Sequence, residues 1–152
     1  MDISVSNRQN ALPLKSQKKK IALIATCVVE SEKRRCDELA IFLISEEQIC
    51  KMHKKFFDDP TPTDCISFPI CDEEEAGYNY LGDVFVCSET AKKYAEKHNT
   101  DPYRETTLYI VHGLLHLLGY DDMDPISKRC MRRKEKKYLK MLEDRGLLLC
   151  HS

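Results

Sequence analysis

The segment from residue 102 to residue 118 is apolar on nearly all sides, and it nevertheless contains two histidines. Asp101 and Pro102 are typical of a helix start, because aspartate caps free backbone N–H groups and proline fits the first turn. Gly119 is typical of a helix end. A helix that is apolar on nearly all sides has to be enclosed by other elements. The sequence therefore predicts a helix that is buried in the core of a domain.

The rest of the chain combines short strand-like runs with amphipathic helices. Strands are expected at residues 2–6, 36–44, 65–70 and 81–87, and further helices at 19–29, 45–57, 88–98 and 124–144. Ser45 and Ser88 are expected to cap two of these helices. Residues 1–152 contain no linker, repeat or low-complexity segment. We therefore expect an α+β fold, a single domain with one mixed sheet of about four strands packed with about five helices.

Charge and cysteine content narrow the function classes only partly. The formal net charge of the 152 residues is −1, which neither favours nor excludes a nucleic-acid partner. None of the eight cysteines forms a Cys-x-x-Cys pair, so zinc-ribbon and thioredoxin-type motifs are excluded. The chain shows no signal peptide, and no apolar run approaches the roughly 18 residues of a membrane span. A location in the reducing cytoplasm, without a membrane partner, is expected.

His112 and His116 stand four residues apart on the buried helix. Residues at this spacing lie on one helical face about 5–6 Å apart, so both imidazoles can bind one ion. The chain turns at Gly119, and Asp122 follows at a position suited to a third ligand. Three protein ligands leave a fourth position open for water, as in catalytic zinc sites. The spacing predicts a metal site of His112, His116 and Asp122, with Asp121 as the alternative third ligand.

Two other interpretations of these histidines are weaker. A lone histidine in an apolar helix is more often a hydrogen-bonded core residue, but two histidines with an acid at matching spacing favour a metal. The metallopeptidase motif His-Glu-x-x-His carries its glutamate base directly after the first histidine. Gly113 occupies that position here and cannot accept a proton. The motif therefore disfavours a peptidase and favours a different reaction on the same metal.

Residues 112–121, HGLLHLLGYD, resemble the signature of the YbeY family of bacterial endoribonucleases, His-Gly-x-Leu-His-Leu-x-Gly-Tyr-Asp-His. Two segments upstream support the resemblance in the family's order. PTDCISFP at residues 62–69 is similar to Pro-Thr-Asp-Val-Leu-Ser-Phe-Pro, and LGDVFVC covers residues 81–87. The resemblance implies an α+β domain with one catalytic zinc ion. It also implies cleavage of single-stranded RNA in ribosomal RNA maturation, at the 3′ end of 16S RNA, and in ribosome quality control.

The resemblance assigns the first two metal ligands and the catalytic role to His112 and His116, but the family's third histidine falls on Asp122. A carboxylate oxygen is an acceptable zinc ligand, although its charge should make a bound water less acidic than a third imidazole would. The harder oxygen donor also makes the site more receptive to manganese and other divalent ions. We expect a retained site for one Zn²⁺ ion per chain with an altered metal preference.

Phe57 is a second departure from the family pattern. Many members carry an aromatic residue and an arginine shortly before the Pro-Thr-Asp segment, and that arginine is implicated in activity. The pair is Phe56-Phe57 here, so the usual cation for the scissile phosphate is absent from that place. Lys54 and Lys55 are the candidate replacements. The departure concerns catalytic efficiency and not the fold.

Other residues are candidates for RNA contact or for support of the metal site. Six basic residues form two rows at helical spacing on the last expected helix: Lys128, Arg129, Arg132, Arg133, Lys136 and Lys137. Clustered cations of this kind suit phosphate binding, and a solvated helix face is the equally simple interpretation. Ser67 is expected in the cleft, and Asp83 is expected to orient a ligand histidine or to occupy a turn. His53, His98 and His151 are expected to be ordinary surface residues.

These observations favour a metal-dependent endoribonuclease without a nucleotide cofactor. Its expected partners are ribosomal RNA of the small subunit and ribosomal proteins. A weakly catalytic or non-catalytic ribosome assembly factor with a mainly structural metal is the alternative, because the third ligand and the arginine both depart from the family pattern. A metallopeptidase is the third class, which Gly113 disfavours.

Overall fold

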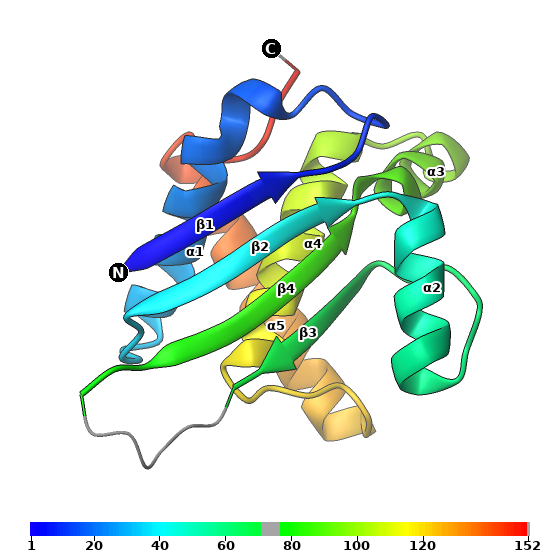
Figure 1. The fold of residues 1–152 in the computed structure, drawn as a ribbon. Helices are drawn as coiled ribbons and strands as arrows, with labels where there is room; N and C mark the ends of the chain where they lie inside the picture. Colours follow the sequence, from blue (N-terminus) through cyan, green and yellow to red (C-terminus); the bar gives the residue numbers. More distant parts are fainter. Residues whose placement is uncertain (71–76, 152) are drawn as a thin grey trace.

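A mixed sheet of four strands is the centre of the fold (Figure 1), seen in a computed structural model that describes residues 1–70 and 77–151. The strands are β1 (Asp2–Asn7), β2 (Glu38–Ile44), β3 (Cys65–Pro69) and β4 (Tyr80–Cys87). The helices are η1 (Lys15–Gln17, a 3-10 turn), α1 (Lys18–Ser31), α2 (Glu46–Phe57), α3 (Ser88–His98), α4 (Pro102–Leu117) and α5 (Pro125–Asp144). For the described residues, this confirms the expected α+β class, the mixed sheet of four strands and the five α-helices.

The strand order across the sheet is β1-β2-β4-β3. The strands β1, β2 and β4 run parallel to one another, whereas β3 is antiparallel to β4 and forms an edge of the sheet. Phe42 of β2 is paired with Phe85 of β4, and Ser67 of β3 with Val84 of β4. Pro69 ends β3 on this edge, where the missing N–H of a proline is tolerated.

Each face of the sheet packs against different helices (Figure 1). α4 crosses one face, and α1, α3 and α5 are arranged around it. Alternate residues of β2, such as Ile41 and Leu43, join the large core on this side, whereas Ile44 faces the smaller core under α2. Within α4 only Arg104 is exposed, so the predicted burial of this helix is confirmed. None of the helices in the described ranges is long and apolar enough to cross a membrane.

Two expected features near element ends are wrong. The second strand begins at Glu38, because Asp37 instead binds the segment before β4: its carboxylate accepts from the backbone N–H of Asn79 at 2.6 Å. Ser88 is not an N-cap but the first residue of α3, and its buried hydroxyl donates to the side chain of Gln9 at 2.7 Å. Ser45, in contrast, caps α2 as expected by accepting from the N–H of Gln48.

Candidate metal centre

The last two turns of α4 and the loop after it bring two imidazoles and a carboxylate together. The Nε2 atoms of His112 and His116 lie 3.0 Å apart. The carboxylate of Asp122 approaches them, with Oδ2 3.5 Å from Nε2 of His112 and Oδ1 3.8 Å from Nε2 of His116. Ligands of one zinc ion lie about 2.0–2.2 Å from it, so these three groups are close enough to share an ion.

A tight turn after α4 returns the chain to the two histidines. α4 ends at Leu117, and Gly119 adopts a left-handed φ of +99° that other residues rarely adopt. The N–H of Tyr120 then donates to the carbonyl of Leu115 at 3.0 Å, which closes the turn. This geometry places Asp122 beside the imidazoles. Asp121 is exposed, and its carboxylate accepts from the N–H of Met123 instead.

Both imidazole rings are held through their Nδ1 atoms. Nδ1 of His112 lies 2.8 Å from Oε1 of Glu135, and Nδ1 of His116 lies 2.9 Å from the backbone carbonyl of Tyr120. A carbonyl and a carboxylate only accept hydrogen bonds, so each neutral ring carries its proton on Nδ1. In this neutral form the two Nε2 lone pairs and the carboxylate of Asp122 face one another. This set of donors fits a cation, which removes their mutual repulsion.

The turn is anchored by a nearly buried carboxylate directly after the end of α1. Glu32 accepts hydrogen bonds from the hydroxyls of Tyr120 and Tyr138, and Lys134 forms an ion pair with it at 3.0 Å. Burial alone would raise the pKa of Glu32, but these hydrogen bonds lower it to about 2, so the group is charged at neutral pH. Because Tyr120 also supplies the carbonyl that holds His116, the network fixes one wall of the centre.

The surroundings of His112 are electrostatically negative. Burial lowers the pKa of this histidine, but the hydrogen bond with Glu135 and the charges of Asp64, Glu135 and Asp122 outweigh burial and raise it. A site that favours a protonated imidazole also favours a bound cation at the same place.

Two cavities flank the centre, and each contains one of the histidines in its wall. The larger, of about 480 Å³, has His116, His53, Phe57, Cys65, Ser67 and Tyr120 in its wall. The smaller, of about 190 Å³, is bordered by His112, Asp64, Asp122, Glu135, Lys128 and Arg132. The pair of histidines is therefore accessible from a mostly apolar side and from a charged side.

The larger cavity places Phe57 and His53 together. Phe57 is 57% exposed, and its ring centroid lies 5.7 Å from that of His53. Neither Lys54 nor Lys55 lies in the cavity wall, and Lys55 instead covers the ring of Phe56. The expectation that His53 is an ordinary surface residue is wrong: its side chain is 19% exposed, and its Nδ1 lies 2.8 Å from the carbonyl of Thr61.

The two supporting residues expected from the sequence differ in position. Ser67 lies in the wall of the larger cavity, and its hydroxyl donates to the carbonyl of Gly113 at 2.8 Å, which attaches β3 to α4. Asp83 has neither expected role. It lies within β4 and not in a turn, and its carboxylate accepts from the hydroxyl of Tyr80 at 2.5 Å. Glu135 has the role that was expected of Asp83.

The six basic residues of α5 that were expected to contact RNA are all exposed, but only Lys128 and Arg132 among them border a cavity of the centre. The other four lie elsewhere on the exposed surface of the helix: Arg129, Arg133, Lys136 and Lys137.

Glu135 was not identified as a functional residue in the sequence analysis. It is the only acid between residues 125 and 142. A lone carboxylate in a basic helix that follows a histidine motif was the signal for it.

The chain is similar to known proteins of one family. The family model described as "Endoribonuclease YbeY" matches residues 2–143. A protein named endoribonuclease YbeY from Protochlamydia amoebophila is 44% identical over 141 residues, which cover 93% of each chain. Another from Chlamydia abortus is 33% identical and covers 98% of this chain and 96% of the relative. The solution structure of TM1509 from Thermotoga maritima shares the fold, with a TM-score of 0.67 at 23% identity over 95% of this chain and 91% of that one.

Proposed function

The chain belongs to the YbeY endoribonuclease family, and we propose that it is a metal-dependent endoribonuclease that cleaves single-stranded RNA. The observation that carries the metal dependence is the convergence of two imidazole nitrogens and one carboxylate. Both Nδ1 atoms are bound to acceptors, so the Nε2 atoms of His112 and His116 face the carboxylate of Asp122 with lone pairs. We propose Zn²⁺ as the ion, with other divalent ions accepted because Asp122 provides an oxygen.

The residues of the centre have separate tasks in the proposed reaction. His112, His116 and Asp122 would hold the ion, which supplies Lewis acidity toward a phosphodiester and lowers the pKa of a water molecule. Glu135 and the carbonyl of Tyr120 keep both rings oriented with Nε2 toward the ion. Lys128 and Arg132 border the same cavity as His112 and would neutralise the RNA phosphates there.

We propose that the substrate is ribosomal RNA of the small subunit, at the 3′ end of 16S RNA. This follows from the family and from the basic side of the centre, where exposed cations on α5 adjoin the metal ligands. Ribosomal proteins as partners, a role in ribosome quality control and action in the cytoplasm belong to the same proposal.

An RNA cleavage assay tests this function. The purified protein, loaded with one divalent ion, is expected to cut a single-stranded fragment of small-subunit ribosomal RNA, and the chelated protein is expected to leave it intact. Cleavage that survives chelation would refute the metal mechanism. A loaded protein that binds the RNA without cutting it would favour an assembly factor, the class that Phe57 supports because it replaces the family's arginine.

Replacement of Asp122 tests the third ligand. Asp122→Ala removes the carboxylate that lies 3.5–3.8 Å from both Nε2 atoms, so metal affinity is expected to fall by more than about 10-fold. Asp122→His is expected to restore zinc binding and to lower the affinity for manganese relative to zinc. Metal titration with both variants measures these effects. Asp121→Ala is the matched control, and a loss of affinity there instead would transfer the ligand role to Asp121.

Replacement of two cations on α5 tests the RNA contact. Lys128→Gln with Arg132→Gln is expected to weaken RNA binding at low salt and to reduce the slope of log K against log salt by about 1.4, because each phosphate contact contributes about 0.7 for single strands. The control Lys92→Gln with Lys97→Gln removes the same charge from exposed positions on α3. Binding is measured by fluorescence anisotropy over a salt series. Equal slopes for both double variants would refute the contact.

A further inference from the structure

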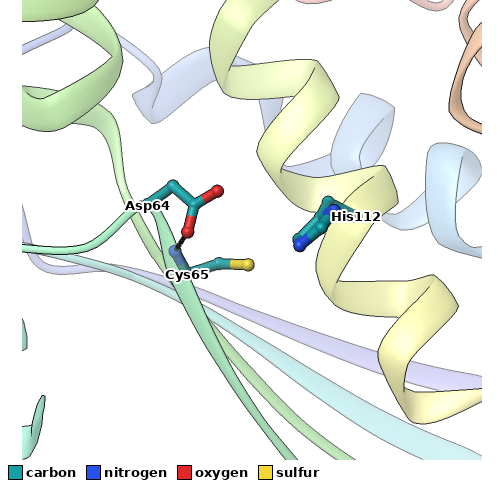
Figure 2. Close-up of side chains that lie close together, drawn as sticks. All are labelled: Asp64, Cys65 and His112. Atoms are coloured by element: carbon teal, nitrogen blue, oxygen red, sulfur yellow. Dashed lines mark hydrogen bonds between the residues drawn. The ribbon is translucent and has the colours of Figure 1, made fainter. Parts of the chain in front are cut away.

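A second group of metal-binding side chains shares His112 with the first. Asp64, in the loop before β3, and Cys65, the first residue of β3, face His112 on α4 (Figure 2). One ligand atom from each residue lies within 4.8 Å of the other two. Ligands of one tetrahedral zinc ion at about 2.0–2.3 Å lie roughly 3.3–3.8 Å apart, so side-chain movements of about 1 Å suffice to enclose an ion.

The hydrogen bonds around this group leave suitable ligand atoms available. Oδ1 of Asp64 accepts from the N–H of Cys65 at 2.8 Å and from the hydroxyl of Thr63 at 3.2 Å, which leaves Oδ2 for an ion. Nδ1 of His112 is bound to Glu135, so Nε2 is the nitrogen that either group has to use. One nitrogen lone pair binds one ion, and the two groups therefore compete for it.

We infer that Asp64, Cys65 and His112 form a second position for a thiophilic divalent cation, and that this position and the one at His116 and Asp122 exclude each other. The inference goes beyond the proposed ribonuclease function and rests on it only through His112. Cysteine sulfur is a soft ligand that selects Cd²⁺ and Zn²⁺ over Mn²⁺, whereas the first position offers only nitrogen and oxygen. Cys65 also lies in the wall of the larger cavity, from which an ion can enter.

Occupation of the second position requires removal of the thiol proton. Burial and the charges of Asp64, Asp122 and Glu135 raise the pKa of Cys65 well above its ordinary value, so the free thiol is neutral. Binding of a dication breaks the S–H bond, forms the sulfur–metal bond and releases one proton to solvent. The sulfur–metal bond offsets the loss of this proton, and it is strongest for thiophilic ions.

Cobalt spectroscopy tests the inference without an activity measurement. Co²⁺ in excess is titrated into the wild type, Cys65→Val, Cys65→Ser and the control Cys50→Ser, which alters a half-buried thiol on α2. The wild type and the control are expected to show a near-ultraviolet sulfur-to-cobalt charge-transfer band. Both Cys65 variants are expected to lack it and to keep the visible bands of cobalt at the histidines. Circular dichroism checks that each variant is folded. Because Cys65 is replaced by two different residues, the test still gives a result if one of the two variants misfolds.

Cadmium inhibition supplies the functional comparison. The Cd²⁺ concentration for half-inhibition of RNA cleavage is expected to rise at least about 10-fold in the Cys65 variants, since a direct ligand is lost. A wild type without a charge-transfer band, or a band that persists in both Cys65 variants, would overturn the second position. Failure of the ribonuclease proposal can be distinguished from failure of the second position. In that case the wild type would show the charge-transfer band but would not cleave RNA.

Discussion

Replacement of His116 by alanine is expected to abolish stoichiometric binding of Mn²⁺, an ion that only the position at His112, His116 and Asp122 favours, and to lower the rate of RNA cleavage by more than about 100-fold. Changes to residues that only orient a ligand cost about 10–100-fold, and His116 is proposed as a direct ligand. At this position the substitution leaves Nε2 of His112 and one carboxylate, too few donors to hold an ion there, and the sulfur of Cys65 disfavours Mn²⁺ at the second position. Metal content by mass spectrometry and single-turnover cleavage of labelled RNA measure the two effects.

The control for this experiment is His98→Ala, which removes an exposed histidine from the end of α3. It is expected to retain the metal and the activity of the wild type. Thermal unfolding of chelated wild type and chelated His116→Ala separates loss of ligand from loss of fold, because without metal the two proteins differ only in the packing of this half-buried side chain. Cleavage by His116→Ala at the wild-type rate would show that the reaction does not use this centre.

Local sequence signals predicted most of the helices and strands, because helix caps and hydrophobic periodicity depend only on residues that are close together in the chain. The caps Ser45 and Asp101 accept the N–H bonds expected of them, and the helices α2 and α4 begin where these caps place them. The strand order β1-β2-β4-β3 could not be predicted, since it depends on pairing between distant segments. Ser88 looked like a cap for the same local reason, but its hydroxyl bonds to Gln9, 79 residues away.

The candidate metal centre shows the same division between local and distant contacts. His112, His116 and Asp122 follow one another along a helix and its closing turn, so their convergence could be read from spacing alone. Glu135 and Asp64 reach His112 from α5 and from the loop before β3, and only the packing of these segments on α4 reveals them. Asp83 was expected to orient a ligand histidine or to occupy a turn, yet it lies within β4 and its carboxylate accepts from the hydroxyl of Tyr80.

Gly113→Ala is the second large effect that the structure predicts. A Cβ atom at residue 113 would lie 2.4 Å from Cγ1 of Val84 and 3.3 Å from Oγ of Ser67, so α4 would have to move away from the sheet. Overpacking of this kind costs about 1–3 kcal/mol, and the better helix propensity of alanine returns about 1 kcal/mol. A net loss of up to about 2 kcal/mol and a fall in Tm of up to about 8 °C are expected from urea and thermal unfolding.

The close approach at Gly113 also explains the absence of the peptidase glutamate, because no side chain fits between α4 and β4 at this position. A double-mutant cycle with Val84→Ala isolates this contact. Val84 is fully buried, so its truncation alone is destabilising, but it removes the atom that blocks a Cβ at residue 113. In the Val84→Ala background, Gly113→Ala is expected to be neutral or stabilising. An equal loss in both backgrounds would mean that the contact with Val84 does not determine the glycine.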